Sequence, residues 1–548
     1  MEIQTMKKLE KTAIKKSSTD LSRLGFALFF MIAVLTFSFL NNGGIPNNMF
    51  LAVAALIGAY MAMNIGANDV ANNVGPAVGS KALTMTTAII IAAVFEASGA
   101  IIAGGEVVQT IKNGIIDIST FDGQTDHFIW AMMAALLAAA LWLNFATMMR
   151  APVSTTHSIV GGVMGAGIAA AGFSVVSWGT MGTIVASWVI SPVLGGVIAA
   201  AFLYAIKKTI VFREDKVQAA KKYVPIFVAI MAWAFVTYIT LKGLKKIWPR
   251  ILELVNMLPL VSIEIQKKPS FETASMMGLV IGVAVYFLVK NKLNANGSNL
   301  ENNKKSVNRL FTIPLIFSAA LLSFAHGAND VANAIGPLAA INDAIINGGV
   351  STKASIPFWV MAVGGFGIAV GLALYGPKLI KTVGSEITKL DQIRAFSIAM
   401  AASITVIVAS QLGLPVSSTH IAIGGVFGVG FLREWLDLRD VENTVADDKL
   451  VIVDEKKNLN ALSAALKAAE AKETKIKEDY ERIVELYKLI ADEEEAIKST
   501  KKHMKKAKKV EYVKRDAVKK IIAAWLITVP AAAILSAVLF FMIKGIMI

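Results

Sequence analysis

The sequence has no cysteine and few charged residues for its length of 548. The absence of cysteine excludes disulfide bonds, thiolate metal sites and cysteine nucleophiles. Charged residues make up 17% of the chain, whereas an average soluble domain has about 25%. This scarcity of charge excludes a soluble enzyme, a disordered chain and a nucleic-acid-binding protein as descriptions of the whole chain.

Where charges are missing, apolar residues form long stretches. No charged residue occurs from position 151 to 206, and a helix that crosses a bilayer needs only about 20 apolar residues. The mean hydropathy of +0.61 agrees with this pattern. The sequence therefore predicts an all-α integral membrane protein with about 12–13 spans. Its thirteen apolar stretches, some of which could be half-helices or re-entrant, are 24–40, 49–66, 84–103, 128–148, 151–172, 175–206, 223–241, 273–289, 311–325, 355–376, 394–412, 415–432 and 518–543.

Charge is distributed unevenly between the loops that join these stretches. The net charge of +15 is expected to lie mostly in the cytoplasm, because basic loops stay inside. The basic leader 1–23 has no small-residue cleavage site after its apolar stretch, so we expect a retained span and a cytoplasmic N-terminus. Strict alternation then places the basic segments 207–222, 290–310 and 377–393 inside, whereas the basic segment 242–272 falls outside and conflicts with the rule. The predicted location is the plasma membrane, which is the inner membrane if the source is bacterial.

Two motifs occur twice in the same order. Segment 64–79 resembles segment 325–340 through the shared letters GANDVAN, and segment 151–162 resembles segment 414–425 through PVS-[ST]-TH. Seven predicted crossings separate the two GAND motifs, and this odd number predicts two inverted-topology repeats with one extra span at 223–241 between them. Transporters built in this way bind substrate near the bilayer midplane, where broken helices meet. A parallel repeat is the alternative if one span is miscounted.

These features divide the chain into six parts. They are a basic cytoplasmic N-terminus (1–23), a first transmembrane repeat (24–206), a linker with one extra span (207–272), the first part of a second repeat (273–432), a soluble coiled-coil insertion (433–517) and the last span of the second repeat (518–548). In the insertion, mostly apolar residues recur three and four positions apart from Leu459 to Met504, which is typical of a coiled-coil seam. The seam could join two protomers in a homodimer, or the helix could break near Glu473 or Glu494 and fold back. A solvated helix without a partner is the remaining alternative.

Asp69 and Asp330 occupy the same position in the two GAND motifs. An ionised carboxylate in a membrane span usually faces a cavity or a cation, and the Gly-Pro pair after each motif is expected to break the helix and free backbone carbonyls. Hard cations prefer such oxygen ligands. The sequence therefore predicts an Na⁺ site whose metal ligands are the two aspartates, assisted by the neighbouring amides Asn68, Asn72, Asn329 and Asn333. Helix capping by each aspartate is the alternative.

The second motif places a proline and several hydroxyl residues before a glycine-rich apolar run. This order is typical of a helix start, where unpaired N–H groups and the positive end of the helix dipole favour an anion. Two such starts from opposed repeats could surround a tetrahedral oxyanion with the hydroxyl groups of Ser154, Thr155, Thr156, Ser417, Ser418 and Thr419. Ordinary N-caps, with His157 and His420 as filler, are the alternative.

Two further ionisable residues are candidates for function. Glu96 is the only acidic residue in the thirteen stretches, and an acidic residue inside a membrane is a functional candidate by default. It could bind a cation, carry a proton or pair with a helix end. His326 directly precedes the second GAND motif and could titrate near neutral pH, whereas its counterpart Ile65 cannot.

The doubled GANDVAN and PVS-[ST]-TH motifs resemble the signature of the inorganic phosphate transporter (PiT) family, over residues 24–432 and 518–543. The resemblance implies a helical, inverted-repeat secondary transporter that imports inorganic phosphate by symport with Na⁺ or H⁺. It also implies that Asp69 and Asp330 are the essential aspartates of the family.

The resemblance extends to other site residues. It implies that Ser154 and Ser417, with the hydroxyls after them, bind phosphate, and that Glu96 matches a glutamate of the Na⁺-coupled members. Those members carry a second glutamate where this chain has Ala399, so coupling to Na⁺ or to H⁺, and its stoichiometry, stays open. The insertion at 433–517 has no counterpart in the family pattern.

The favoured function is import of inorganic phosphate with Na⁺ as the coupling ion, without another cofactor and without nucleic acid as a partner. H⁺-coupled uptake of phosphate or sulfate on the same scaffold is one alternative. An anion channel, or a phosphate receptor that signals through the coiled coil, is another. We expect no enzyme activity, because neither a set of nucleophile, base and orienting residue nor a nucleotide motif is visible. The expected partners are phosphate, Na⁺ or H⁺, the lipid bilayer and, in the homodimer alternative, a second copy of the chain.

Overall fold

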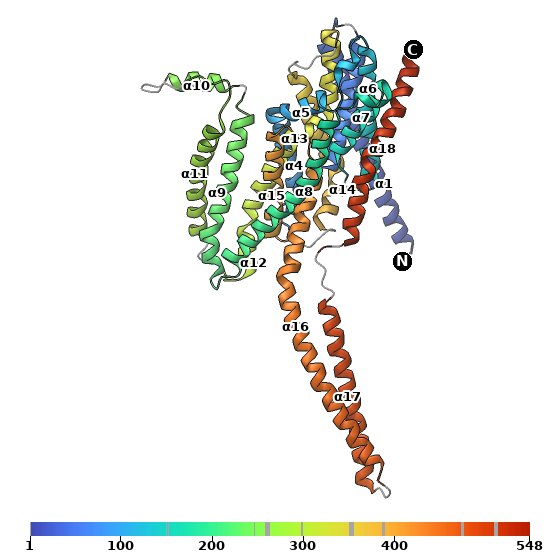
Figure 1. The fold of residues 1–548 in the computed structure, drawn as a ribbon, viewed down its shortest axis with the longest axis vertical. Helices are drawn as coiled ribbons and strands as arrows, with labels where there is room; N and C mark the ends of the chain where they lie inside the picture. Colours follow the sequence, from blue (N-terminus) through green and yellow to red (C-terminus); the bar gives the residue numbers. More distant parts are fainter. Residues whose placement is uncertain are drawn as a thin grey trace. The chain divides into compact units, whose positions relative to one another are not determined.

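The computed structural model describes residues 2–45, 47–149, 151, 153–245, 247–257, 264–296, 300–349, 356–385, 390–472, 476–508, 513 and 515–548. These residues are helical almost throughout (Figure 1), which confirms the all-α prediction. A bridge between Ile116 and Val176 is the one β-type pairing among them. The chain divides into two compact units, Met1–Val429 with Arg515–Ile548, and Gly430–Lys514.

The helices follow the chain in this order. They are α1 (Glu2–Asn41), α2 (Asn48–Asn68), α3 (Val70–Gly79), α4 (Met85–Ala103), α5 (Gly105–Asn113), α6 (Thr125–Met148), α7 (Thr155–Ala171), α8 (Trp178–Ile206), α9 (Lys216–Lys242), α10 (Trp248–Asn256), α11 (Phe271–Asn296), α12 (Lys304–Leu310), α13 (Thr312–Asn347), α14 (Phe358–Ser385), α15 (Gln392–Gln411), α16 (Ser418–Glu470), α17 (Lys477–Lys508) and α18 (Arg515–Met547).

Eleven helical segments in the described part of the chain are long and apolar enough to cross a bilayer. The two predicted stretches without such a segment are 151–172 and 415–432, which hold α7 and the first turns of α16. α7 has only 17 residues, and both helices begin at buried residues of the repeated motif, Thr155 and Ser418. These two equivalent helix starts are therefore the best candidates for the predicted half-helices.

Large apolar side chains cover much of the outside of the first unit. Phe29 in α1, Val189 in α8 and Leu526 in α18 each expose 65% or more of their surface. Soluble proteins rarely expose so much apolar surface, whereas in a bilayer such side chains face lipid. The exposure pattern agrees with a multi-pass membrane protein.

The motif helix of each repeat packs against a helix of the other repeat. α2 packs against α14, and α13 packs against α4. A Cβ atom on Gly66 would lie 1.9 Å from the carbonyl oxygen of Ile368, and one on Gly327 would lie 2.2 Å from that of Glu96. Equivalent residues thus make equivalent contacts, as a two-fold relation between the repeats requires. The inverted orientation of the two copies stays a prediction.

A second set of glycines fixes the register between these helices. A Cβ atom on Gly99 of α4 would lie 2.0 Å from the carbonyl oxygen of Phe324, and one on Gly371 of α14 would lie 1.9 Å from that of Met63. Met63 and Phe324 are equivalent in the repeat, so Gly99 corresponds to Gly371. In the same register, Glu96 corresponds to Ile368.

The two GAND motifs differ in local structure. In the first copy the helix is interrupted at Asp69, between the end of α2 and the start of α3, whereas Pro76 of the Gly-Pro pair lies inside α3, so the break is not at the predicted place. In the second copy α13 continues without a break through Asp330 and Pro337, so the prediction of a break there is wrong. A proline removes one N–H and crowds the preceding turn, but the tight packing of α13 against neighbouring helices holds the helix together.

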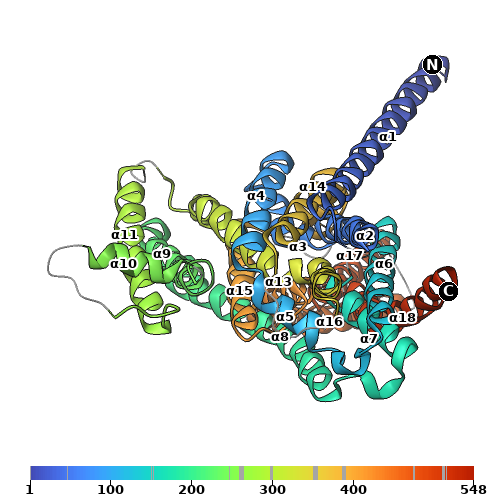
Figure 2. The ribbon, with the colours of Figure 1, turned by 90° about the horizontal axis from the view of Figure 1, so that it is seen from above.

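The linker between the repeats forms a helical hairpin. α9 and α11 pack against each other, with α10 between them in the chain (Figure 2). α9 also reaches the first unit's interior through Tyr238, which contacts Phe324 of α13. The sequence places α11 in the second repeat, but its main packing partner is α9.

The second unit is an antiparallel pair formed by the later part of α16 and by α17. Side-chain hydrogen bonds join Asn458 to Glu493 and Glu455 to Thr500 across the pair. α16 ends at Glu470 and α17 begins at Lys477, so the folded-back alternative describes this segment; Glu473 lies outside the described residues. The predicted seam is only partly covered in α17, because Ile476, Tyr480 and Tyr487 are exposed while Ile497 is buried, as is Leu486, which is not a seam position.

Candidate functional site

The repeated motifs of both copies meet in one buried cluster. Thr155, in the first turn of α7, donates hydrogen bonds to Oδ2 of Asp69 (2.7 Å) and to Oδ2 of Asp330 (3.4 Å). In the first turn of α16, Thr419 donates to Oδ1 of Asp69 (3.0 Å) and Ser418 to Oδ2 of Asp330 (3.2 Å). All five side chains are at most 1% exposed. Each helix start thus supplies hydroxyl groups to carboxylates from both repeats.

Two asparagines tie the helix starts to the aspartate helices of the opposite repeat. Asn72 Nδ2 donates to Thr419 Oγ1 (2.8 Å), and Asn333 Nδ2 donates to Thr155 Oγ1 (3.0 Å) and Thr156 Oγ1 (3.1 Å). The side-chain oxygens of Asn72 and Asn333 accept no hydrogen bond, although they are buried. Oδ1 of Asp330 is also without a donor.

The unpartnered oxygens are the observation that bears on whether the cluster could bind a cation. Buried acceptors are normally paired, and a buried carboxylate needs a neutralising partner. Hard cations are held by carboxylate and amide oxygens. The free oxygens of Asn72, Asn333 and Asp330, on the helices that carry the GAND motifs, are therefore of the chemical type that holds a hard cation such as Na⁺.

The other two predicted amides hold loops instead of facing the carboxylates. Asn68 Nδ2 donates to Thr147 Oγ1 (2.9 Å), and Asn68 Oδ1 accepts from the backbone N–H of Val153 (3.3 Å). Asn329 Nδ2 donates to Ser410 Oγ (2.9 Å) and to the carbonyl of Leu414. Both asparagines thus position the segments that lead into α7 and α16.

The first hydroxyl of each predicted anion motif is a helix cap. Ser154 Oγ accepts from the N–H of His157 (3.1 Å), and Ser417 Oγ accepts from the N–H of His420 (3.3 Å). This is the geometry of an N-cap, as the alternative interpretation expected. Thr156 donates to a backbone carbonyl of the opposite motif. The hydroxyls that face the carboxylates are those of Thr155, Ser418 and Thr419.

The two histidines of the motif form an aromatic contact beneath the cluster. The rings of His157 and His420 are 4.4 Å apart, and each packs on a tryptophan, Trp188 at 3.8 Å and Trp525 at 3.5 Å. Trp188 also donates to the carbonyl of Pro415. The histidines thus join the two helix starts, in agreement with their interpretation as filler.

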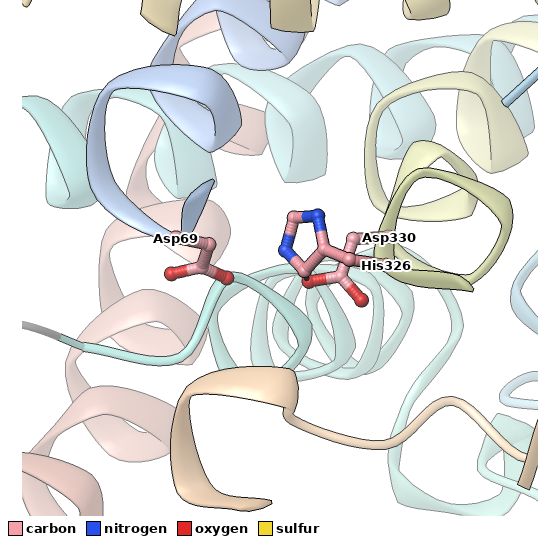
Figure 3. Close-up of side chains that lie close together, drawn as sticks. All are labelled: Asp69, His326 and Asp330. Atoms are coloured by element: carbon pink, nitrogen blue, oxygen red, sulfur yellow. Dashed lines mark ion pairs between the residues drawn. The ribbon is translucent and has the colours of Figure 1, made fainter. Parts of the chain in front are cut away.

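Glu96 joins the cluster through His326. The carboxylate of Glu96 is fully buried and lies 2.6 Å from Nδ1 of His326, and it accepts a hydrogen bond from Asn73 Nδ2 (2.7 Å). Nε2 of His326 lies 3.1 Å from Oδ2 of Asp330. Ligand atoms of Asp69, His326 and Asp330 all lie within 4.8 Å of one another (Figure 3). The imidazole therefore connects Glu96 to the paired aspartates.

The sequence marks His326 as a group that could titrate, but it does not predict which side chains His326 contacts. The signal for one of its contacts is its spacing from Asp330, because residues four apart lie on the same helix face. Its contact with Glu96 depends on the packing of α13 against α4, which local sequence does not reveal. The repeat does not draw attention to Asn73, because the equivalent position in the second copy is Ala334.

The chain of Asn73, Glu96 and His326 exists in only one half of the site. The equivalent positions in the other half are Ala334, Ile368 and Ile65, all apolar and fully buried. Ala399, where the resemblance implies a second glutamate in Na⁺-coupled members, is buried in α15 and offers no side-chain ligand. The symmetric cluster of aspartates and hydroxyls therefore carries one asymmetric, ionisable branch.

Three comparisons with known proteins agree on the family. Residues 65–536 match the Phosphate transporter family. The chain is 49% identical over 544 residues to a protein of Helicobacter pylori strain J99 named "Putative phosphate permease", and the match covers 98% of both chains. A permease of the same name from Haemophilus influenzae is 39% identical over 382 residues, which cover 70% of this chain and 87% of the relative.

A solved structure is similar over most of the chain. It is that of a protein named "The sodium-dependent phosphate transporter", it is 30% identical, and it superposes with a TM-score of 0.68 over 91% of this chain and 99% of its own. The two chains therefore share their fold over most of their length. With the doubled motifs gathered in one buried cluster, this chain belongs to the phosphate transporter family.

Proposed function

We propose that this protein is a symporter of the plasma membrane that imports inorganic phosphate together with Na⁺. The observation that carries the proposal is the single buried cluster in which hydroxyls of both helix starts meet carboxylates of both GAND motifs. One half of such a cluster suits an oxyanion and the other half suits a cation.

The hydrogen bonds of the cluster give a physical reason for coupling. The hydroxyls of Thr155, Ser418 and Thr419 each have one proton to donate, and each donates it to Asp69 or Asp330. A phosphate can accept these protons only if the carboxylates find another partner. A cation provides that partner and also offsets the repulsion between the carboxylates and the anion, which is strong at short range in a buried site. Phosphate and cation therefore stabilise each other's binding.

The choice of Na⁺ is supported by the unpartnered amide and carboxylate oxygens of Asn72, Asn333 and Asp330. The similar solved structure is of a transporter named as sodium-dependent, and this name describes that protein. A second candidate, H⁺-coupled uptake of phosphate or sulfate, is favoured by a different observation. The branch from Asp330 through His326 to Glu96 contains three groups that can hold a proton.

The test is uptake of radiolabelled phosphate into proteoliposomes, with the Na⁺ gradient and the pH gradient imposed separately. Symport with Na⁺ predicts accumulation driven by Na⁺ alone, inhibited by phosphate analogues but not by sulfate. Accumulation driven only by the pH gradient would replace Na⁺ by H⁺ in the proposal. Uptake that ignores both gradients would indicate a channel, and binding without uptake would indicate a receptor. The Asp330→Asn variant serves as the control for cluster-dependent uptake.

A further inference from the structure

A cavity of about 470 Å³ lies beside the first GAND motif. Its lining includes Met63 and Ala67 of α2, Thr147 of α6 and Tyr375 of α14. Thr147 is hydrogen bonded to Asn68, the residue next to Asp69. Two lining residues, Ala67 and Thr147, thus adjoin Asn68, which precedes Asp69 of the ligand cluster in the chain.

The equivalent place beside the second GAND motif is filled. The repeat pairs Met63 with Phe324, Ala67 with Ala328 and Thr147 with Ser410, and the packing register pairs Tyr375 with Ala103. Phe324, Ala328 and Ala103 form one hydrophobic core cluster, and its fourth buried member is Tyr238 of α9.

The side chain of Tyr238 fills the space beside the second GAND motif that is equivalent to the cavity. It is 1% exposed, and its ring centroid lies 6.1 Å from that of Phe324 in an edge-to-face contact. Phe235, one turn earlier in α9, contacts the same phenylalanine at 5.5 Å. α9 lies in the linker between the repeats, so Tyr238 has no counterpart by sequence beside the first GAND motif.

The hydroxyl of Tyr238 is not what holds it there. It lies beside Ser410, but no hydrogen bond of good geometry joins it to another group. A buried hydroxyl without a partner destabilises the folded protein by about 1–3 kcal/mol. The side chain is therefore held mainly by its contacts with Phe324 and the rest of the apolar cluster, and it can leave without breaking a hydrogen bond of good geometry.

We propose that Tyr238 is a plug that closes the ligand cluster on the side of the second repeat, while the cavity beside the first repeat is the route of access. The proposal rests on the proposed transport function, because a two-sided site needs one closed and one open path at a time. Transport to the other side then requires Tyr238 to withdraw from Phe324, Ala328 and Ser410. The plug comes from the linker helix, so movement of α9 controls one of the two paths.

The lining of the cavity indicates the side of the membrane to which it opens. Asp20 of α1 and Lys378 of α14 also line it, and both belong to segments that sequence alternation places on the cytoplasmic side. The plugged side is then the path from the exterior. The structure thus corresponds to a form in which the exterior path is the closed one.

The absence of cysteine from the chain makes the proposal testable by thiol labelling. The two reporters are Thr147→Cys, in the cavity, and Ser410→Cys, at the equivalent position behind Tyr238. Leu21→Cys marks the face of Asp20, because Leu21 is 71% exposed. A membrane-impermeant maleimide is applied to right-side-out and inside-out vesicles that hold each variant.

The reporters are expected to differ in accessibility. Thr147→Cys should react from the same face as Leu21→Cys, whereas Ser410→Cys should be protected from both faces. Adding Tyr238→Ala should raise labelling of Ser410→Cys from the opposite face by about tenfold or more, because an opening that is rarely populated becomes permanent. Tyr238→Phe keeps the ring and is the matched control, so it should leave the protection in place.

Clear outcomes overturn the proposal. One is an unchanged labelling rate of Ser410→Cys in the Tyr238→Ala background; another is labelling of Thr147→Cys only from the face opposite Leu21→Cys. If Tyr238→Ala does not give folded protein by size-exclusion chromatography, Tyr238→Leu removes the ring with less loss of volume and must give the same increase. Labelling needs no transport, so it separates failure of the plug from failure of the proposed function, which phosphate uptake in the same vesicles reports.

Discussion

Replacement of Glu96 by glutamine tests the asymmetric branch of the site. The Glu96 carboxylate accepts a hydrogen bond from Nδ2 of Asn73 at 2.7 Å and lies 2.6 Å from Nδ1 of His326, with no exposure to solvent. A glutamine side chain has one acceptor oxygen and one NH₂ donor group. In Glu96→Gln the amide oxygen can serve only one of these neighbours, so the NH₂ group faces Nδ1 of His326, which must then give up its proton, and the negative charge next to the imidazole is lost.

The size of the effect follows from these contacts. A hydrogen bond to a charged group contributes about 1.5–3 kcal/mol and a neutral one about 0.5–1.5 kcal/mol, so replacing the two charge-assisted contacts of Glu96 by neutral ones costs about 2–3 kcal/mol. A rise of about 2–3 kcal/mol in the free energy of the loaded state that limits uptake lowers kcat/KM for phosphate roughly 30- to 150-fold. The assay is initial uptake into proteoliposomes at several phosphate concentrations, normalised to inserted protein.

The two-fold relation supplies a matched control. Ile368 is the counterpart of Glu96, so Ile368→Val changes the equivalent place in the other half without touching a polar contact, and uptake should stay near that of the unchanged protein. His326→Gln should reduce uptake as Glu96→Gln does. The double variant should lose little more than either single variant, because both changes break the same contact. Unreduced uptake by Glu96→Gln, or losses that simply add in the double variant, would refute the reasoning.

Three more predictions concern the cluster and the second unit. Asp69→Asn and Asp330→Asn should each abolish cation-coupled uptake while the protein still inserts, because each removes a charge from the network of four hydroxyl contacts; uptake and membrane fractionation check this. Thr155→Val should weaken phosphate and Na⁺ binding together, by about 1–3 kcal/mol, whereas Ser154→Ala should mainly lower thermal stability through loss of a cap worth about 1 kcal/mol; calorimetric titration and melting curves distinguish the two. Replacement of residues 440–512 by a short Gly/Ser linker should leave uptake within about twofold, because the second unit is compact by itself; complete loss of uptake in a folded variant would contradict this.

The repeated motifs carry most of what sequence alone could predict. Asp69, Asp330 and the hydroxyls after Ser154 and Ser417 each occur in collinear copies, and related copies are expected to meet on a common axis. The apolar stretches likewise predict the membrane helices, because the length of a span is set by the bilayer. These two arguments need no knowledge of how one helix packs on another.

The remaining features depend on packing, which local patterns do not reveal. The partnership of Glu96 with His326 joins positions far apart in the chain, and only the contact of α4 with α13 brings them together. Similarly, Pro337 predicts a break that the surrounding helices suppress. In the insertion, the apolar spacing continues past the turn, so it could not show that the helix folds back and that Tyr480 and Tyr487 face outward.

The interlocking of the two repeats has a consequence for biogenesis. Asp69 and Asn72 of the first repeat are at most 1% exposed. Asp69 accepts a hydrogen bond from Thr419 of the second repeat, and Asn72 donates one to it. Thr419 is synthesised 350 residues after Asp69, which corresponds to roughly 18–70 s at translation rates of about 5–20 residues per second. During this interval a carboxylate and an amide of a nascent span lack their final partner, so the insertion machinery must shelter them from lipid. A ribosome that stalls between the repeats therefore leaves a half-protein in the membrane that cannot complete its own interior and becomes a substrate for quality-control proteolysis.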